Sequence, residues 1–342
     1  MNDKENSPIL QGNFTQAGAL VVKAEAVILD VNAVDLQDTS VSVTAGRETG
    51  ALEASIRTIG VLNPPLLARK REGEGYRVVC GMLRMKAVAA CGATSFRAQV
   101  AAADTDEQVL VLASLADNVP HRVFNPVEHA RAAALLAGTF PDHMALRVWN
   151  ELLGMPRAYA VFDQYRKIAG AGETVHALML QGSITVDTAF ALVRMAHEDR
   201  ACFCDLFSQL HFSARKQAEI LEYCDDISRR DGITLHEVLE RSGVLKALRC
   251  DMHGKDGQRA EQIRRSIKLL RFPRLAAKER SVHELIRSMK LPPTITFEPP
   301  PFFEGDTWRL NVRVTSDRDM RDAAARLAEI AEHPGLKKLL EE

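Results

Sequence analysis

The stretch from Gly75 to Gly92, GYRVVCGMLRMKAVAACG, decides how the first part of the chain folds. Gly75 to Cys80 alternates and is rich in β-branched and aromatic residues, which predicts a strand. Gly81 gives the backbone freedom for an abrupt turn, and Met82 to Ala90 repeats apolar residues at helical spacing. The first N–H groups of that helix and the side chain of Arg84 form an arrangement that can hold a phosphate. Because strand–glycine–helix turns are common, this stretch alone does not establish such a site.

Two further stretches flank this turn. Upstream lies Ser55 to Arg69, SIRTIGVLNPPLLAR, and downstream lies Asp117 to Ala130, DNVPHRVFNPVEHA. In this order and spacing the three stretches resemble the ParB family of chromosome and plasmid partition proteins. That family shows an SI...GVxQPxxV segment, a GxRRxxA turn and an ENxxRxxLxPxEEA segment, followed by a helix-turn-helix. The resemblance covers roughly residues 25 to 195.

The resemblance implies that the turn binds CTP together with Mg²⁺. The nucleotide-binding positions that it assigns are Asn63, Gly81, Arg84, Asn118 and His121. The metal positions that it assigns are Asp117 and Asn118, whose carboxylate and amide oxygens suit this hard cation. The residues alone leave a second interpretation open, in which Asn118 is a left-handed C-cap before Pro120.

The chain departs from the family pattern at three positions. Leu83 stands at the first arginine of GxRR, so one bidentate clamp on phosphate oxygens is missing. His121 stands at the arginine of the downstream segment, with Arg122 next to it. Asn63 replaces the usual glutamine and shortens its reach by one methylene. We therefore expect nucleotide binding with at most weak CTPase activity, and we assign no catalytic residue.

The composition is that of an ordinary globular protein, with 342 residues, 46% hydrophobic and 26% charged, and a net charge of −1. No stretch approaches the roughly 20 apolar residues of a membrane span, and the first residues, MNDKEN, have no signal-peptide pattern. We expect a cytoplasmic, nucleoid-associated protein with no membrane partner. The six cysteines form no CxxC pair and are most simply small apolar residues. A metal cluster at Cys202 and Cys204 is disfavoured, because Cys-x-Cys on a helix points the thiols apart.

The expected fold class is α+β and mostly helical. Residues 1–24 have no helical or strand period and are expected to be a flexible tail. Short strands and helices alternate over residues 25–102, which predicts a small α/β domain, of the ParB/sulfiredoxin type by resemblance. Residues 103–250 are expected to form an all-helical DNA-binding domain, residues 255–290 a basic helical linker, and residues 291–342 a small strand–strand–helix association unit.

A helix-turn-helix is predicted near residues 145–168. It consists of a helix from Ala145 to Leu153, a turn at Gly154-Met155-Pro156 and a second helix from Arg157 to Ile168. A plain antiparallel helix pair would look similar, and the order of the upstream motifs favours DNA binding. The candidate DNA-binding side chains are Arg157, Tyr159, Gln164, Arg166 and Lys167. The second helix is more apolar than the family's SRSxVSNLLRLL, so the DNA sequence that it reads is not implied.

Charge and size suggest roles for the last third of the chain. Residues 255–290 hold eleven Lys or Arg and four Asp or Glu, which fits either an auxiliary DNA contact or a solvated helical face. The unit at residues 291–342 buries too little apolar surface to stand alone, which favours self-association. We expect a homodimer. The resemblance also implies a ParA-type ATPase partner, although the N-terminal tail lacks the arginine with which family members stimulate it.

Two classes of function fit these residues. The first is a sequence-specific DNA-binding protein of the partition type, which binds a palindromic site as a dimer and is gated by CTP. A milder version is a transcription regulator without the nucleotide switch, which the missing arginine would fit. The second class is a nucleotide-dependent enzyme, a phosphotransferase or nuclease, on the same N-terminal fold. The sulfiredoxin-like cysteine follows the glycine, whereas Cys80 precedes Gly81, so a buried strand cysteine is favoured here.

Overall fold

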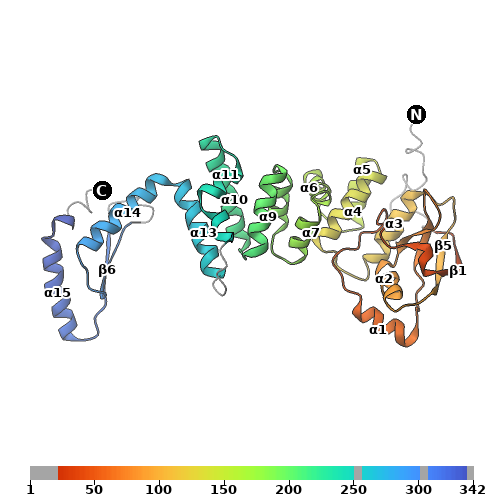
Figure 1. The fold of residues 1–342 in the computed structure, drawn as a ribbon, viewed down its shortest axis with the longest axis horizontal. Coiled ribbons are helices and arrows are strands. Elements are labelled where there is room, and N and C mark those ends of the chain that lie inside the picture. The colour runs from red at the N-terminus through yellow and green to blue at the C-terminus, as the bar shows by residue number, and fades with distance from the viewer. Residues whose placement is uncertain (1–21, 250–255, 301–306, 337–342) are drawn as a thin grey trace. The chain divides into compact units, whose positions relative to one another are not determined.

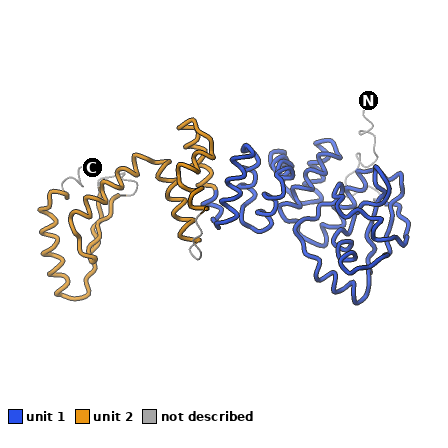
Figure 2. The backbone as a smooth tube through the Cα atoms, viewed as in Figure 1, with its two compact units in different colours: residues 1–217 blue, residues 218–342 orange. Residues whose placement is uncertain are grey.

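The computed structural model describes residues 22–249, 256–300 and 307–336 (Figure 1). The predicted tail therefore lies outside the described residues up to position 21. The chain divides into two compact units, residues 1–217 and 218–342 (Figure 2). No helix in the described part of the chain is long and apolar enough to cross a membrane.

The first unit begins with a mixed five-stranded sheet in the order β1-β5-β3-β4-β2. Its strands are β1 (Ala24–Asp30), β2 (Val34–Asp35), β3 (Leu66–Arg69), β4 (Tyr76–Cys80) and β5 (Ser95–Ala101). β1 pairs antiparallel with β5, β3 pairs antiparallel with β4, and β3–β5 and β2–β4 are parallel. A 3-10 turn, η3 (Val31–Ala33), connects β1 to β2.

The sheet separates two hydrophobic clusters, and β4 contributes to both because successive side chains of a strand point to opposite faces. Val78 packs with Met85 of α2 (Met82–Ala90), on the side that also receives Ile56 of α1 (Gly50–Ile59). Val79 packs into the larger cluster together with Leu112 of α3 (Glu107–Asn118). The turn after β4 is therefore fixed between packed layers.

The larger cluster continues into a helical region. Its helices are α4 (Pro126–Thr139), α5 (Asp142–Glu151), α6 (Tyr159–Ala169), α7 (Glu173–Leu180), α8 (Val186–Val193) and α9 (His197–Gln209). Trp149 of α5 and Phe162 of α6 are buried in it and meet edge to face at 5.5 Å between ring centroids. Thr185 caps α8 with its side chain, which accepts from the backbone N–H of Thr188. α10 (Ala214–Asp231) begins at the end of this unit.

The second unit contains the rest of α10, four more helices, a two-stranded antiparallel sheet and a last helix. They are α11 (Leu235–Arg241), α12 (Val244–Arg249), α13 (Asp256–Arg271), α14 (Pro273–Ser288), β6 (Ile295–Glu298), β7 (Arg309–Val312) and α15 (Asp317–Ala331). A small core of Val282, Met289, Ile295 and Ile330 joins α14, β6 and α15. The fold class, α+β and mostly helical with a small α/β region at each end, is confirmed.

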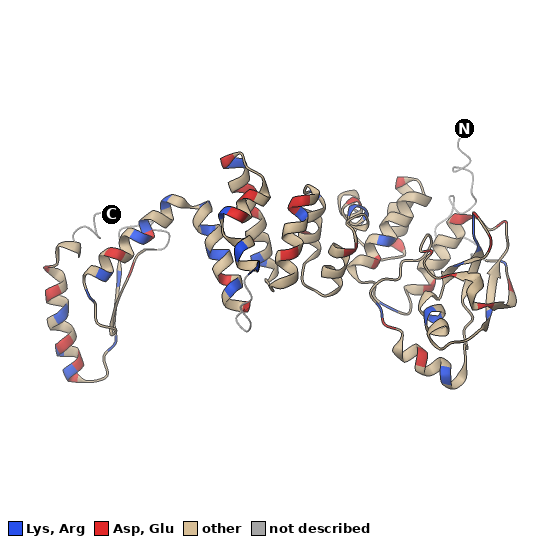
Figure 3. Cartoon of the chain, viewed as in Figure 1, with Lys and Arg blue, Asp and Glu red and all other residues tan. Residues whose placement is uncertain are grey.

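Basic and acidic residues are interspersed along α13 and α14 (Figure 3). Within this stretch Arg264 pairs with Glu219 at 2.8 Å, and Arg271 pairs with Asp226 at 2.7 Å. These two pairs join α13 to α10, so part of the positive charge of the basic stretch serves packing within the second unit.

Two local predictions were wrong, and one stretch of the chain carried no prediction. The residues after β1 form η3 and β2, and they continue into a loop whose Val41 and Val43 are fully buried, none of which the sequence suggested. α6 starts at Tyr159 instead of Arg157, because the chain turns through Pro156, whose carbonyl accepts from Ala158 N at 2.8 Å. Asn118 is the last residue of α3 in a right-handed conformation, so the left-handed cap is excluded. Its carbonyl accepts from His121 N and Arg122 N, which continues the turn past Pro120.

Candidate nucleotide and DNA sites

Gly81 forms the turn between β4 and α2 in a conformation that other residues rarely adopt. Its φ is +87° and its ψ is 31°, in the left-handed region. A Cβ placed there would lie 3.0 Å from both Cζ and Nε of Arg84. Glycine is therefore required twice, once by its backbone and once because the guanidinium of Arg84 lies across it.

Arg84 connects three segments at this turn. Its Nη1 donates to the carbonyl of Asn63 at 2.7 Å, and its Nη2 lies 3.5 Å from Oδ2 of Asp117. The side chains of Arg84 and Asp117 keep 25% and 36% of their surface exposed. The structure thus brings together four of the predicted site residues, Asn63, Gly81, Arg84 and Asp117, although Asn63 contributes its backbone. The long contact between partly exposed groups is weak, so both charges remain available to a ligand.

Three contacts along β4 and α3 hold this site in place. At the start of β4, Arg77 is buried and its Nη1 donates to Glu107 at 2.9 Å. At its end, Sγ of Cys80 donates to the carbonyl of Ala113 at 3.5 Å, and beyond it Arg84 meets Asp117. Burial by itself would raise the pKa of Glu107, but hydrogen bonds and attraction from Arg77 outweigh it and lower that pKa. The charged pair therefore fixes the strand against the helix.

Cys80 lies directly before the turn but is not placed as a nucleophile. Burial, with a smaller contribution from the charge of Asp117, raises the pKa of its thiol to about 12. The thiolate, which is the reactive form, is therefore scarce at neutral pH. This agrees with the interpretation of Cys80 as a buried strand cysteine.

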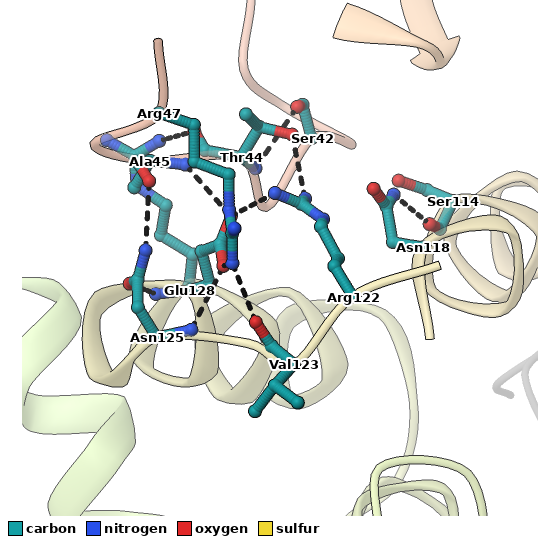
Figure 4. Close-up of polar contacts among 11 residues, drawn as sticks. Ser42, Thr44, Ala45, Arg47, Ser114, Asn118, Arg122, Val123, Asn125 and Glu128 are labelled. Atoms are coloured by element: carbon teal, nitrogen blue, oxygen red, sulfur yellow. Dashed lines mark hydrogen bonds and ion pairs between the residues drawn. The ribbon is translucent and has the colours of Figure 1, made fainter. Parts of the chain in front are cut away.

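The two remaining residues predicted to bind nucleotide, Asn118 and His121, do not take part in these contacts with Arg84. Nδ2 of Asn118 donates to the carbonyl of Ser114 at 2.7 Å, so the amide points back along its own helix (Figure 4). His121 is exposed in the connection that follows α3. Among the described residues no group of three or more His, Cys, Asp or Glu side chains could hold a metal ion. Mg²⁺ at this turn would take Asp117 as its carboxylate and its other ligands from phosphates and water, as is usual for this ion.

A second polar cluster, which the sequence analysis missed, surrounds Glu128 at the start of α4 (Figure 4). Its side chain is completely buried and accepts from Nε of Arg47 at 2.9 Å, from Nη2 of Arg47 at 2.7 Å and from Nη1 of Arg122. Asn125 and Glu128 also form a capping box, with Asn125 N donating to Oε2 at 3.0 Å. We call Arg47, Arg122, Asn125 and Glu128 the Glu128 cluster.

The Glu128 cluster joins the loop before α1 to the helical region. Arg122 Nη2 also donates to the hydroxyl of Thr44 at 3.0 Å, and Asn125 Nδ2 donates to the carbonyl of Ala45 at 3.0 Å. Burial would raise the pKa of Glu128, but hydrogen bonds from Arg47 and Asn125 and the charge of Arg122 lower it. The N-P-V-E pattern at residues 125–128 is a visible capping-box signal, but it does not reveal the arginine partners.

The second helix of the predicted helix-turn-helix presents a polar face. Gly154 makes the turn with φ of +66°, and Nδ2 of Asn150 donates to the carbonyl of Met155 at 2.8 Å. Phe162 and Ile168 of α6 are buried, so the opposite side of the helix faces outward. Of the predicted DNA-binding residues, Tyr159, Arg166 and Lys167 are exposed on α6, Arg157 is exposed just before it, and Gln164 is partly buried.

Asp163 occupies this outward face, and the sequence analysis did not single it out. Arg166 Nε donates to its Oδ1 at 3.1 Å, and Lys167 Nζ lies 2.7 Å from its Oδ2. Hydrogen bonds from Lys167 and then from Arg166 lower the pKa of Asp163. The i,i+3 and i,i+4 spacing of one acid and two bases was the signal that could have found it.

Residues 22–119 match the family model described as the ParB N-terminal domain. Three solved structures are similar to part of this chain. The first is the C-terminally truncated chromosome-partitioning protein ParB from Caulobacter crescentus complexed with CTP-γ-S. It is 18% identical, covers 54% of this chain and 99% of its own, and has a TM-score of 0.26.

The second is the same Caulobacter crescentus protein complexed to the centromeric parS site, with 14% identity, coverage of 62% and 95%, and a TM-score of 0.30. The third is a Pnob8-like ParB-N domain, with 13% identity, coverage of 58% and 89%, and a TM-score of 0.32. No match was found among curated proteins. These TM-scores are below 0.5, and the match at residues 22–119 identifies a ParB N-terminal domain in that part of the chain.

Proposed function

We propose that this chain, which carries a ParB N-terminal domain at residues 22–119, is a sequence-specific DNA-binding protein of the partition type. The observation that carries the proposal is the turn at which Asn63, Gly81, Arg84 and Asp117 converge. The same chain places exposed cationic side chains on α6, the second helix of a helix-turn-helix pattern. A phosphate-holding turn and a basic helix in one unit fit a DNA-binding protein that responds to a nucleotide.

In this proposal CTP binds at the turn with Mg²⁺. The free N–H groups at the start of α2 and the guanidinium of Arg84 would hold phosphate oxygens, and Asp117 would face the metal. Nucleotide would replace the long Arg84–Asp117 contact of 3.5 Å with shorter, charge-assisted bonds. Because Leu83 offers no second guanidinium, the residues favour binding over hydrolysis. His121 and Asn118 would have to turn toward the nucleotide to take part.

The DNA-binding form in this proposal is a homodimer on a palindromic site. In the part of the C-terminal region that the structure describes, the sheet consists of β6 and β7, and a two-stranded sheet gains stability by further packing. Leu310 and Val314, in and after β7, and Met320 of α15 are exposed apolar side chains there. If a second copy of the chain covers these side chains, the homodimer has one α6 helix for each half-site of a palindromic DNA site. A ParA-type ATPase is the partner that the partition role would require.

The experiment is to sequence the genomic DNA fragments that the purified full-length chain retains at moderate salt, with and without CTP and Mg²⁺. Enrichment at one or a few palindromes is the expected result, and spreading of the signal around them with CTP would support the nucleotide switch. Sharp enrichment without spreading would favour the regulator without a switch. No enrichment above input would overturn the proposal and favour the enzyme hypothesis.

A matched pair of variants tests the role of α6. Arg166→Ala is expected to weaken binding to the enriched site and to reduce the slope of log affinity against log salt by about 1. Arg229→Ala removes an arginine from a comparable exposed pair, Arg229–Asp225 on α10, and should change neither. If both variants bind DNA as the parent does, α6 is a structural helix.

A further inference from the structure

Asp163 lies at the centre of the outward face of α6. Residues three and four positions apart share one side of a helix, so Tyr159, Ala160, Arg166 and Lys167 surround it. All four of these neighbours are exposed, while Phe162 and Ile168 hold the opposite side in the core. If α6 enters a DNA groove as proposed above, Asp163 is the side chain that faces the bases most directly.

An acid at this position is costly for affinity alone. A carboxylate on a DNA-facing surface is repelled by the phosphates, whereas Arg157, Arg166 and Lys167 are attracted to them. The carboxylate oxygens of Asp163 also pair with Nε of Arg166 at 3.1 Å and with Nζ of Lys167 at 2.7 Å. The side chain of Asp163 is 19% exposed. Arg166 and Lys167 must therefore release the Asp163 carboxylate before their charged groups can contact DNA phosphates directly. Non-specific binding would therefore be tighter without this acid.

We propose that Asp163 is a specificity-determining residue, which accepts a hydrogen bond from the N4 amino group of a cytosine in the major groove. This inference rests on the proposed DNA-binding function. A carboxylate has only acceptors, and in the major groove it matches the amino donor that cytosine presents. When Arg166 and Lys167 turn outward to phosphates, the Asp163 oxygens that they occupied become free for the base. The same step thus couples phosphate contact to base reading.

The neighbours of Asp163 fit this geometry. Ala160, one turn before it, is small, so the helix can approach the base edges closely on that side. Tyr159 is 47% exposed and can contact the backbone or a base at the N-terminal end of the helix. The basic residues Arg166 and Lys167 lie on the following turn of the helix, where they can reach the DNA phosphate backbone beside the groove. Acceptor and donors are therefore separated along one helix face.

The test compares Asp163→Ala with Asp225→Ala, because an asparagine would keep an oxygen that can accept from the cytosine amino group. Asp225 pairs with Arg229 four residues later on α10 at 2.8 Å, so its variant loses the same charge from a similar pair on another helix. Affinities are measured for the site found in the genomic experiment, for that site with each base pair replaced in turn, and for a random duplex. Circular dichroism checks that each variant folds.

For Asp163→Ala we expect tighter binding to the random duplex and a specific-to-random ratio that falls about tenfold, the size of one good base contact. The loss should be confined to one cytosine in each half-site, where the parent discriminates and the variant does not. Asp225→Ala should keep the parent ratio. An Asp163→Ala protein that still discriminates at every position overturns the inference while leaving the proposed function intact. A parent chain that prefers no sequence overturns both.

Discussion

The turn at Gly81 and the start of α4 both set arginine against a carboxylate, yet they leave the charges in opposite states. At the turn one arginine and one carboxylate meet at 3.5 Å, with about a quarter and a third of their side chains exposed. In the Glu128 cluster two arginines and a backbone N–H close around a carboxylate with no exposed surface. The same residue types therefore serve two purposes.

The difference lies in what remains for a ligand. A loosely paired, partly exposed arginine can exchange its partner for a phosphate at little cost. A buried carboxylate that is fully hydrogen-bonded cannot exchange its partners without leaving a charge unpaired in the interior. We therefore expect the turn to bind and the Glu128 cluster to hold the loop before α1 on the helical region.

The largest expected effect is the loss of stability when the Glu128 cluster is disrupted. Glu128→Gln removes the charge that compensates Arg47 and Arg122, so the free energy of unfolding should fall by about 3 kcal/mol. Urea denaturation followed by circular dichroism measures it. The matched control is Glu151→Gln, which opens the exposed pair with Arg147 and should cost about 0.5 kcal/mol or less. Equal losses in the two variants would show that the Glu128 cluster is an ordinary surface pair.

Removing Arg84 from the turn at Gly81 should affect CTP binding much more than stability. Arg84→Ala should weaken CTP binding by about 10- to 100-fold, the range for charge-assisted hydrogen bonds, as measured by isothermal titration calorimetry with Mg²⁺. Its free energy of unfolding should change by less than about 1 kcal/mol. Arg57→Ala removes a similar long contact, 3.4 Å to Glu53 on α1, and should leave CTP affinity unchanged. If Arg84→Ala binds CTP as the parent does, Arg84 is not in the site.

A pair of glycine substitutions, with a smaller expected effect, distinguishes backbone strain from steric pressure on Arg84. Gly81→Ala and Gly92→Ala both force alanine into the left-handed region, at φ of +87° and +72°, and should each cost about 1–2 kcal/mol of stability. Only the Cβ at position 81 would press on the guanidinium of Arg84, since nothing lies within 4 Å of a Cβ at position 92. CTP affinity should therefore drop in Gly81→Ala alone. A drop in both would mean that strain, not Arg84, controls binding.

The smallest effect is a dependence on pH. Because the pKa of Glu128 is lowered on folding, its contribution to stability is complete above the unfolded value of about 4.3 and is lost as the pH falls through the lower folded value. The stability gap between the parent chain and Glu128→Gln should therefore narrow between about pH 5 and about pH 3. Urea titrations at the two pH values measure the gap, and a constant gap would show that Glu128 is not ionised in the fold.

Local features of the chain could be predicted from sequence. The strand, glycine and helix around Gly81 depend on neighbouring residues, and α2 has the bounds that were predicted. Thr185 and Thr234 cap α8 and α11 with their side chains, which is a local preference of the same kind. Where Arg84 points is less local, yet the family pattern placed Asp117 near it, 33 residues away in sequence.

Features that depend on distant partners could not be predicted. Arg47 and Glu128 are 81 residues apart, and neither carries a local signal for the other. Val41 and Val43 carry no local signal for burial, and they are buried because they pack into the larger hydrophobic cluster. The start of α6 was placed two residues early because Ala158, which caps it, provides no side-chain acceptor that would mark a helix start.

The most direct test of the account is amide hydrogen exchange of the full chain, measured by mass spectrometry with and without CTP and Mg²⁺. If nucleotide phosphates bind the first N–H groups of α2, exchange should slow in peptides that cover residues 81–86 and the end of α3 near Asp117. Peptides that cover the Glu128 cluster should exchange slowly in both states, because that cluster is already closed. Unchanged exchange at residues 81–86 under conditions where calorimetry detects CTP binding would contradict nucleotide binding at the Gly81 turn, since the nucleotide would then bind elsewhere.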